Sequence, residues 1–233
     1  MRASEPTGGE PGRGAAPADG GQPPRAGARA RDSAPAPAPP SPDAGKGDWR
    51  AWARAVRGAW AADHQRRADD EAAMHALLAA WGPWRGAGIA LAYVPFGDEP
   101  DPIAPWMREA RAPALATTRT VGPGEPLQLR AWVEPLERHP FGFLQPRPDA
   151  PPVDPGEIDL VLVPGLVFDV HGGRLGHGQG HYDRLLPRLP GHVPLVGVTL
   201  DALVVGRLPT EPHDAPVTHL LTPGGIRAAD GAG

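Results

Sequence analysis

The stretch DLVLVPGLVFD at residues 159–169, followed by RLGHGQGHYDR at residues 174–184, decides the fold expected for this chain. A continuous apolar run that ends in Pro-Gly predicts a strand buried on both faces, as in a parallel sheet. The glycines of the second segment come directly before a helical pattern. A glycine-rich loop at a helix start presents backbone N–H groups to an anion, so the two segments together indicate a phosphate ligand.

The glycine spacing alone leaves two interpretations open. Gly176, Gly178 and Gly180 are not followed by Gly-Lys-Ser/Thr, so the loop is not a Walker A loop, and the third glycine comes one residue early for a dinucleotide fingerprint. A phosphate cradle and a purely structural turn fit the spacing about equally well. Asp183, one turn into the helix, is well placed for Mg²⁺ shared with a phosphate, although a carboxylate there also stabilises the helix dipole.

Helical and strand patterns alternate on both sides of this block. Apolar residues at three- and four-residue steps predict one long helix or two shorter ones over residues 48–81, with Asp48 as the N-cap and Gly82-Pro83 as the end. Further strands are expected at residues 89–94, 114–118, 127–133, 194–199 and 219–222, and helices at residues 102–110 and 183–189.

This alternation predicts an α/β fold class, with a mostly parallel sheet and helices on both faces in a single three-layer domain. Ligands of such sheets bind beyond the carboxyl ends of the strands. The loops at residues 95–99, 164–169 and 199–201 are therefore expected to share one rim.

The two ends of the chain differ in composition from the middle. Residues 1–46 contain no Val, Ile, Leu, Phe, Trp or Tyr, so they have nothing to bury and are expected to form a disordered tail. The domain is expected at residues 47–228, with residues 229–233 as a disordered C-terminus. Lys46, the only lysine, falls in the tail. Deleting residues 1–46 is expected to leave activity and stability almost unchanged.

Composition excludes several classes of protein. The chain has no cysteine, so disulfides, thiolate zinc sites and a catalytic cysteine are excluded. No apolar run approaches the ~20 residues of a membrane span, and the tail lacks the apolar core of a secretory signal. The net charge of −4 and pI of about 6.1 do not indicate a nucleic-acid partner. A cytoplasmic monomer acting on small molecules is expected.

The central block resembles the signature of the 5-formyltetrahydrofolate cyclo-ligases, also called 5,10-methenyltetrahydrofolate synthetases. Weaker matches follow in family order and extend the similarity over roughly residues 48–222. Arg50-x-x-Ala53-Arg54 resembles a nucleotide-binding element of the family, and Tyr93-Val94 with Glu99 resembles its folate-contacting strand and loop. GFLQP at residues 142–146 resembles a Gly-Ile-x-Glu-Pro element. Pro212-His213-Asp214 resembles a segment that carries a second magnesium carboxylate.

The resemblance implies an enzyme that uses ATP as co-substrate and Mg²⁺ as cofactor to convert 5-formyltetrahydrofolate to 5,10-methenyltetrahydrofolate. In that reaction the formyl oxygen attacks the γ-phosphate, and N10 then closes the ring with release of phosphate. Such phosphoryl transfer asks the protein mainly for alignment and charge neutralisation.

The resemblance also implies roles for individual residues. The implied catalytic residues are Arg50, Arg174 and Tyr182, and the implied metal ligands are Asp183 and Asp214. The reduced folate is assigned to Val94, Glu99 and Gln145. ATP is assigned to Arg50, Arg54, Arg174, Leu175, Gly176, His177, Gly178, Gln179, Gly180, His181 and Tyr182.

Departures from the family pattern keep an alternative open. Arg50 stands where the family has lysine, and His181 stands where it has tyrosine. Gln145 replaces a carboxylate, Leu203 replaces a glutamine, and Thr218 occupies a position that is often acidic in the family. A divergent nucleotide-binding paralogue without cyclo-ligase activity would fit these changes.

A metal hydrolase is a further alternative. Its ligands would come from His171, His177, His181 and His213 with the two aspartates. The glycines between His177 and His181 interrupt the helix that their spacing would need, so these two imidazoles need not converge.

Overall fold

The computed structural model describes residues 37–106, 113–122 and 124–231. Most of the expected tail, residues 1–36, and residues 232–233 lie outside this range. Residues 107–110 of the helix expected at 102–110 also lie outside it, and residues 102–105 are not α-helical. Within the described part of the chain, no helix is both long enough and apolar enough to span a bilayer.

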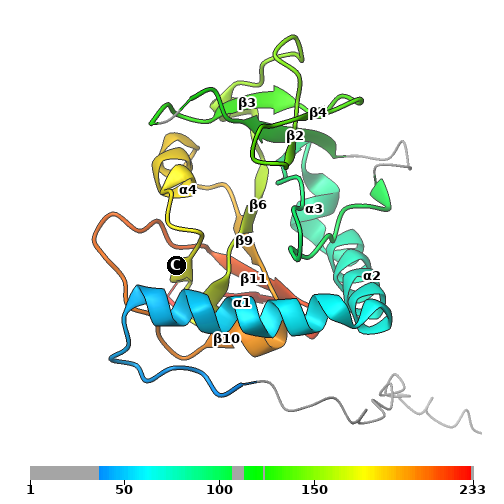
Figure 1. Cartoon of the computed structure of the whole chain (residues 1–233). Coiled ribbons are helices and arrows are strands. Elements are labelled where there is room, and N and C mark those ends of the chain that lie inside the picture. The colour runs from blue at the N-terminus through cyan, green and yellow to red at the C-terminus, as the bar shows by residue number, and fades with distance from the viewer. Residues whose placement is uncertain (1–36, 107–112, 123, 232–233) are drawn as a thin grey trace, which may run out of the picture. The chain divides into compact units, whose positions relative to one another are not determined.

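A seven-stranded sheet in the order β12-β11-β9-β6-β1-β2-β3 forms the centre of the fold (Figure 1). The five inner strands, from β11 to β2, run parallel, and the edge strands β3 and β12 are antiparallel to their neighbours. The predicted mostly parallel α/β sheet is confirmed. Its strands are β1 (Ile89–Leu91), β2 (Ala114–Arg119), β3 (Gln128–Ala131), β6 (Leu160–Pro164), β9 (Leu195–Val198), β11 (His219–Thr222) and β12 (Gly225–Ala228).

The apolar run of β6 is explained by burial on both faces of the sheet. Leu160 and Leu162 pack in one core cluster with residues of α2 (His64–Ala80) and α3 (Gly82–Gly86). Val161 and Val163, the alternate residues, pack in a second cluster with leucines of and after α4 (His181–Leu185). Successive strand residues point to opposite faces, so both sets must be apolar.

The N-terminal helical pattern forms two helices, α1 (Lys46–Ala62) and α2. Asp63 separates them, and its side chain accepts a hydrogen bond from the N–H of Arg66. The predicted N-cap was wrong, because Gly45 caps α1 and Asp48 lies in its first turn. Gly82-Pro83 does follow the end of α2, but it also begins α3, since proline is favoured in the first turn of a helix.

Short strands that the sequence did not predict frame the glycine loop. β7 (Val167–Asp169) lies between β8 (Arg174–Leu175) and β10 (Val204–Val205) in a three-stranded sheet. α1 packs against β7 and β8 through a third apolar cluster. The described residues also form a hairpin of β4 (Glu137–Arg138) and β5 (Leu144–Gln145), and 3-10 turns at Pro155–Glu157, Leu186–Arg188 and Asp201–Leu203.

The ordered domain extends beyond the expected boundary at each end. Lys46 belongs to α1 rather than to a tail. Ala229 is buried, and the N–H groups of Ala229 and Asp230 donate to Thr218 and Val170. Residues 229–231 were therefore wrongly assigned to a disordered terminus, because backbone pairing continues past β12.

Replacing Leu162 with alanine should destabilise the fold strongly, since its side chain is fully buried in β6. The expected loss of unfolding free energy is about 2–5 kcal/mol, measured by urea denaturation. Leu144→Ala, at a side chain that is 41% exposed, is the matched control and should lose far less. Equal losses in the two variants would contradict the assigned core.

Candidate active site

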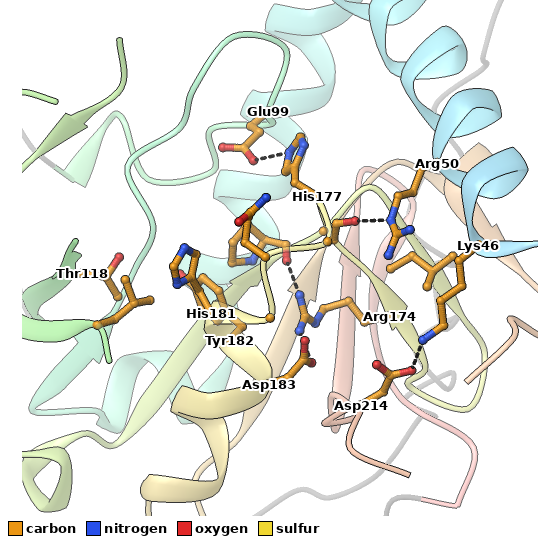
Figure 2. A pocket seen from close by; sticks show the side chains of 18 of the residues that line it. Lys46, Arg50, Glu99, Thr118, Arg174, His177, His181, Tyr182, Asp183 and Asp214 are labelled. Atoms are coloured by element: carbon orange, nitrogen blue, oxygen red, sulfur yellow. Dashed lines mark hydrogen bonds and ion pairs between the residues drawn. The ribbon is translucent and has the colours of Figure 1, made fainter. Parts of the chain in front are cut away.

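A cavity of about 220 Å³ opens where the glycine loop meets α1 and the ends of β2 and β6 (Figure 2). Thirteen of the sixteen predicted site residues line it, although they are spread from α1 to the segment before β11. These are Arg50, Glu99, Arg174, Leu175, Gly176, His177, Gly178, Gln179, Gly180, His181, Tyr182, Asp183 and Asp214. The cavity also borders six residues that were not predicted, namely Lys46, Thr118, Thr120, Leu127, Pro164 and Gly165.

The glycine loop has backbone angles that favour glycine. Gly178 (φ +94°) and Gly180 (φ +64°) lie in the left-handed region, and Gly180 is the residue from which α4 begins. A Cβ on Gly178 would lie 3.6 Å from the guanidinium of Arg50. Arg50 in turn donates from Nε to the carbonyl of Gly176 at 2.9 Å. The loop and α1 therefore form one wall of the cavity.

Lys46 is the main site residue that the sequence analysis missed. Its Nζ lies 2.8 Å from Oδ2 of Asp214 and 3.2 Å from Oε2 of Glu211. Its assignment to the tail was wrong, because Lys46 is the first residue of α1 and lines the cavity. Deleting residues 1–46 would therefore remove a cation from the cavity wall. The available signal was its position four residues before Arg50, which places both on one face of a helix.

Arg54, by contrast, does not reach the cavity and is exposed on α1. At about 100° per residue, Arg54 points about 80° away from Lys46, whereas Arg50 is about 40° away and Arg57 only about 20° away. The predicted nucleotide-binding role of Arg54 is therefore not supported by the geometry. The cationic face of α1 consists of Lys46, Arg50 and Arg57.

Arg174 and Asp183 form a largely buried ion pair at the floor of the cavity. Nη2 of Arg174 lies 2.6 Å from Oδ1 of Asp183, and Nη1 donates to the carbonyl of Pro164 at 3.5 Å. The same carboxylate oxygen accepts from the N–H of Ala215 at 3.4 Å. Asp183 and Asp214 thus lie close together, and each has its own cationic partner (Figure 2).

The charge of Asp214 is stabilised by its surroundings. Partial burial alone would raise the pKa of Asp214, but the hydrogen bonds from Lys46 and from the N–H of Glu211 lower the pKa below its usual value. For Lys46, burial would lower the pKa, but its bonds to Asp214 and Glu211 raise the pKa above the usual value. The pair therefore stays charged throughout the neutral range.

Tyr182 and His181 are neutral at physiological pH. Burial, followed by the charge of Glu99, raises the pKa of Tyr182 far above its usual value. The Tyr182 hydroxyl has no partner in hydrogen-bonding geometry, although Thr118 lies beside it. Burial and then the charge of Arg184 lower the pKa of His181. Tyr182 can therefore act as a hydrogen-bond donor, but not readily as a base or nucleophile.

Glu99 is the predicted folate residue that reaches the cavity. Its side chain is 13% exposed, and its Oε1 lies 3.7 Å from Nε2 of His177 in the glycine loop. Val94 and Gln145 do not line the cavity. Gln145 is buried behind the wall, where it accepts from the N–H of Thr120 and donates to Glu137, each at 3.1 Å. It supports a lining residue rather than offering its own side chain to a ligand.

Three of the five departures that motivated the paralogue alternative, Gln145, Leu203 and Thr218, do not line the cavity, whereas Arg50 and His181 do. Leu203 is fully buried in the cluster under α1, and the Thr218 hydroxyl bonds to both backbone groups of Leu195. Leu203 and Gln145 are buried and Thr218 is half-buried, and the polar contacts of Thr218 and Gln145 are structural. These three side chains consequently give no reason to expect an altered ligand site.

The histidines do not form the centre of a metal hydrolase among the described residues. In the described part of the chain, the side chains of metal-binding type that come close to one another are Glu211, His213 and Asp214, of which the first two are exposed. His177 faces Glu99, while His181 lies beside Arg184. The two loop imidazoles therefore contact different partners, as the intervening glycines predicted.

The fold and the site define an α/β protein in which lysine, arginines and a glycine loop line a cavity at the rim of a mostly parallel sheet. The family model described as the 5-formyltetrahydrofolate cyclo-ligase family matches residues 42–223, so the chain belongs to that family. The resemblance noted in the sequence, and the class of enzyme that it implied, are confirmed.

Individual relatives agree with this membership. A 5-formyltetrahydrofolate cyclo-ligase from Mycolicibacterium smegmatis is 37% identical over 140 residues, which cover 57% of this chain and 72% of the relative. The solution structure of the 5,10-methenyltetrahydrofolate synthetase of Aquifex aeolicus is 28% identical, with a TM-score of 0.68 over 79% of this chain and 92% of that chain. A synthetase structure from Mycoplasma pneumoniae, at 17% identity and a TM-score of 0.62 over 76% of this chain and 98% of that chain, shares the fold.

Replacing Lys46 with methionine should raise the pKa of Asp214, because the ammonium is a major influence that lowers it. A carboxyl group with a lowered pKa stabilises the fold above its unfolded pKa and loses this contribution as pH falls through the folded value. The variant should therefore protonate Asp214 at a higher pH, which carbon-13 NMR titration of the carboxyl can detect. An unchanged titration midpoint would show that the pair has no electrostatic role.

Proposed function

We propose that this protein catalyses the ATP-dependent conversion of 5-formyltetrahydrofolate to 5,10-methenyltetrahydrofolate, with release of ADP and phosphate. The observation that supports this most directly is one cavity in which Lys46, Arg50 and Arg174 meet the glycine loop and Glu99. Family membership gives the class of reaction. The cavity provides an anion-binding side and a side with an acceptor carboxylate.

The anion-binding side suits a triphosphate. The ammonium of Lys46 and the guanidinium groups of Arg50 and Arg174 can neutralise phosphate oxygens from two directions. The backbone of the glycine loop allows close approach, since no Cβ stands at Gly176, Gly178 or Gly180. Charge neutralisation and alignment are the main requirements of phosphoryl transfer.

Asp183 and Asp214 fit a magnesium ion through the chemistry of their donor atoms. Magnesium prefers oxygen ligands and commonly binds one or two carboxylates together with substrate phosphates. Both carboxylates line the cavity beside the glycine loop, and the cations that neutralise them here, Arg174 and Lys46, are also the phosphate-binding candidates. Bound magnesium would supply further neutralisation of phosphate charge.

On the other side of the cavity, the folate would meet Glu99 and Tyr182. The Glu99 carboxylate can accept hydrogen bonds from the N–H groups of a pterin, and Tyr182 lines the same part of the cavity. In the reaction, the formyl oxygen forms a bond to the γ-phosphorus as the bond from that phosphorus to ADP breaks. N10 then attacks the formyl carbon and releases its proton to solvent, and the bond from that carbon to the phosphorylated oxygen breaks to release inorganic phosphate.

The test of this proposal is a turnover assay with 5-formyltetrahydrofolate and MgATP, followed by the absorbance of the methenyl product. Purified protein should form product only when both substrates are present. Folded protein that binds ATP but neither binds nor converts the folate would instead identify the nucleotide-binding paralogue.

Gly178→Ala should weaken nucleotide binding, because a side chain at this positive φ is strained and would distort the loop. The expected effect is about a tenfold rise in the Kd for ATP, equivalent to about 1.4 kcal/mol. Gly191→Ala, where a Cβ meets open space, is the control. Calorimetry that finds the same ATP affinity in both variants would exclude the glycine loop as the phosphate site.

Asp183→Asn should lower kcat/KM by about 100-fold or more, because it removes a charge placed beside the reacting phosphate. Asp149→Asn, at an exposed carboxylate paired with Arg147, should leave turnover unchanged. Melting temperatures of both variants control for stability, since Asp183 also pairs with Arg174. Near-normal turnover without Asp183 would rule out its assigned role.

A further inference from the structure

The loop that carries Glu99 is fastened to the two N-terminal helices by arginines. It follows β1 and spans residues 95–101, with Gly97 in a left-handed conformation (φ +66°). Its backbone and its Asp98 side chain contact Arg57 from α1 and Arg67 from α2. Neither arginine lines the cavity.

Arg57 joins the loop to the sheet rim. Its side chain is only 3% exposed, and Nε and Nη2 lie 2.8 and 2.6 Å from Oδ1 of Asp98. Its Nη1 donates to the carbonyl of Gly165 at 3.3 Å, and Gly165 itself lines the cavity. A single buried guanidinium thus connects α1, the Glu99 loop and the turn after β6.

Arg67 holds the backbone of the same loop. Its Nη1 and Nη2 donate to the carbonyls of Gly97 and Glu99, both at 3.2 Å. Its Nε donates to Glu71 at 2.9 Å, and the same Glu71 oxygen accepts from the N–H of Asp101 at 3.2 Å. The guanidinium also lies 5.3 Å from the centre of the Trp60 ring. These contacts hold the Arg67 side chain in one orientation, and they also hold the backbone of the loop in place.

Within the fastened loop, the Glu99 carboxylate has a defined orientation. Its Oε2 accepts from the N–H of Phe96 at 3.0 Å, and the N–H of Glu99 donates to the carbonyl of Phe96 at 3.3 Å. The other oxygen points toward His177. The carboxylate can therefore meet a ligand without further ordering of the loop.

We propose that Arg57 and Arg67 are positioning residues that set the affinity for the folate by holding Glu99 in place. This inference rests on the proposed function, in which the folate is the ligand of Glu99. A group that is already ordered loses little conformational entropy when its ligand binds. Loss of either arginine should then weaken folate binding while ATP binding, which uses the other side of the cavity, stays intact.

The experiment compares Arg67→Met with Arg66→Met, the neighbouring residue of α2, which is half-exposed and lies 3.7 Å from Asp70. The Kd of 5-formyltetrahydrofolate and the Kd of ATP are measured separately by calorimetry. Arg67→Met should raise the folate Kd about tenfold and leave the ATP Kd within about twofold of the control. Arg67→Lys should recover part of the loss, since one ammonium can reach one of the two carbonyls.

A double-mutant cycle tests Arg57 in the same way. If Arg57 acts through its ion pair, Arg57→Met and Asp98→Asn should each weaken folate binding, and the double variant should lose little more than either one. Additive losses would overturn the role of this pair. If Arg57→Met does not fold, Asp98→Asn and Arg67→Met carry the test.

Hydrogen exchange of residues 96–101 distinguishes a failure of this inference from a failure of the proposed function. Faster exchange in Arg67→Met than in Arg66→Met, together with weaker folate binding, supports the positioning role. Unchanged exchange overturns it, as does an equal loss of ATP and folate affinity. If the wild-type protein binds no folate, the proposed function fails and the folate part of this inference fails with it, while the exchange data still decide whether the arginines hold the loop.

Discussion

The site depends on the contact between the cationic face of α1 and four loops at the rim of the sheet. Lys46 pairs with Asp214, Arg50 bonds to the carbonyl of Gly176, and Arg57 joins Asp98 to Gly165. These loop residues are separated by long stretches of sequence. One helix, anchored by its apolar face on β7 and β8, therefore sets the positions of the cavity walls relative to one another.

Because of this arrangement, the two sides of the cavity are built from different side chains. The cations nearest the start of α1 face the glycine loop and the paired aspartates, where phosphate would bind. Farther along the same face, Arg57 reaches the loop of Glu99, which Arg67 fastens from α2. Both sides share α1 as their support, but they use different side chains. Changes on one side can therefore be separated from changes on the other by measuring each ligand alone.

The sequence predicted those parts of the structure that have a strong local signal. The apolar run of β6 and the three glycines are contiguous, so burial on two faces and a loop at a helix start follow from the residues themselves. Strands β7, β8 and β10 are two or three residues long, which is too short for an alternating pattern to appear. They were missed, although the first two frame the glycine loop.

The site residues that were predicted wrongly have a different physical explanation. Lys46 was assigned to the tail because of the composition of the residues before it, yet its partner Asp214 lies 168 positions later and is brought near only by folding. Arg54 followed from motif spacing, but the helical rotation turns it away from Lys46 and Arg50. Gln145 comes close to the cavity and supports its wall through Thr120. Contacts of this kind depend on packing between distant segments.

The most direct measurement is a crystal structure of the protein with magnesium, a non-hydrolysable ATP analogue and 5-formyltetrahydrofolate. We expect the terminal phosphate to lie between Gly178 and the side chains of Lys46 and Arg50, with the formyl group facing it from the side of Glu99. A triphosphate that contacts neither Lys46 nor Arg50, or a nucleotide bound away from the glycine loop, would contradict the proposed role of the cationic face of α1.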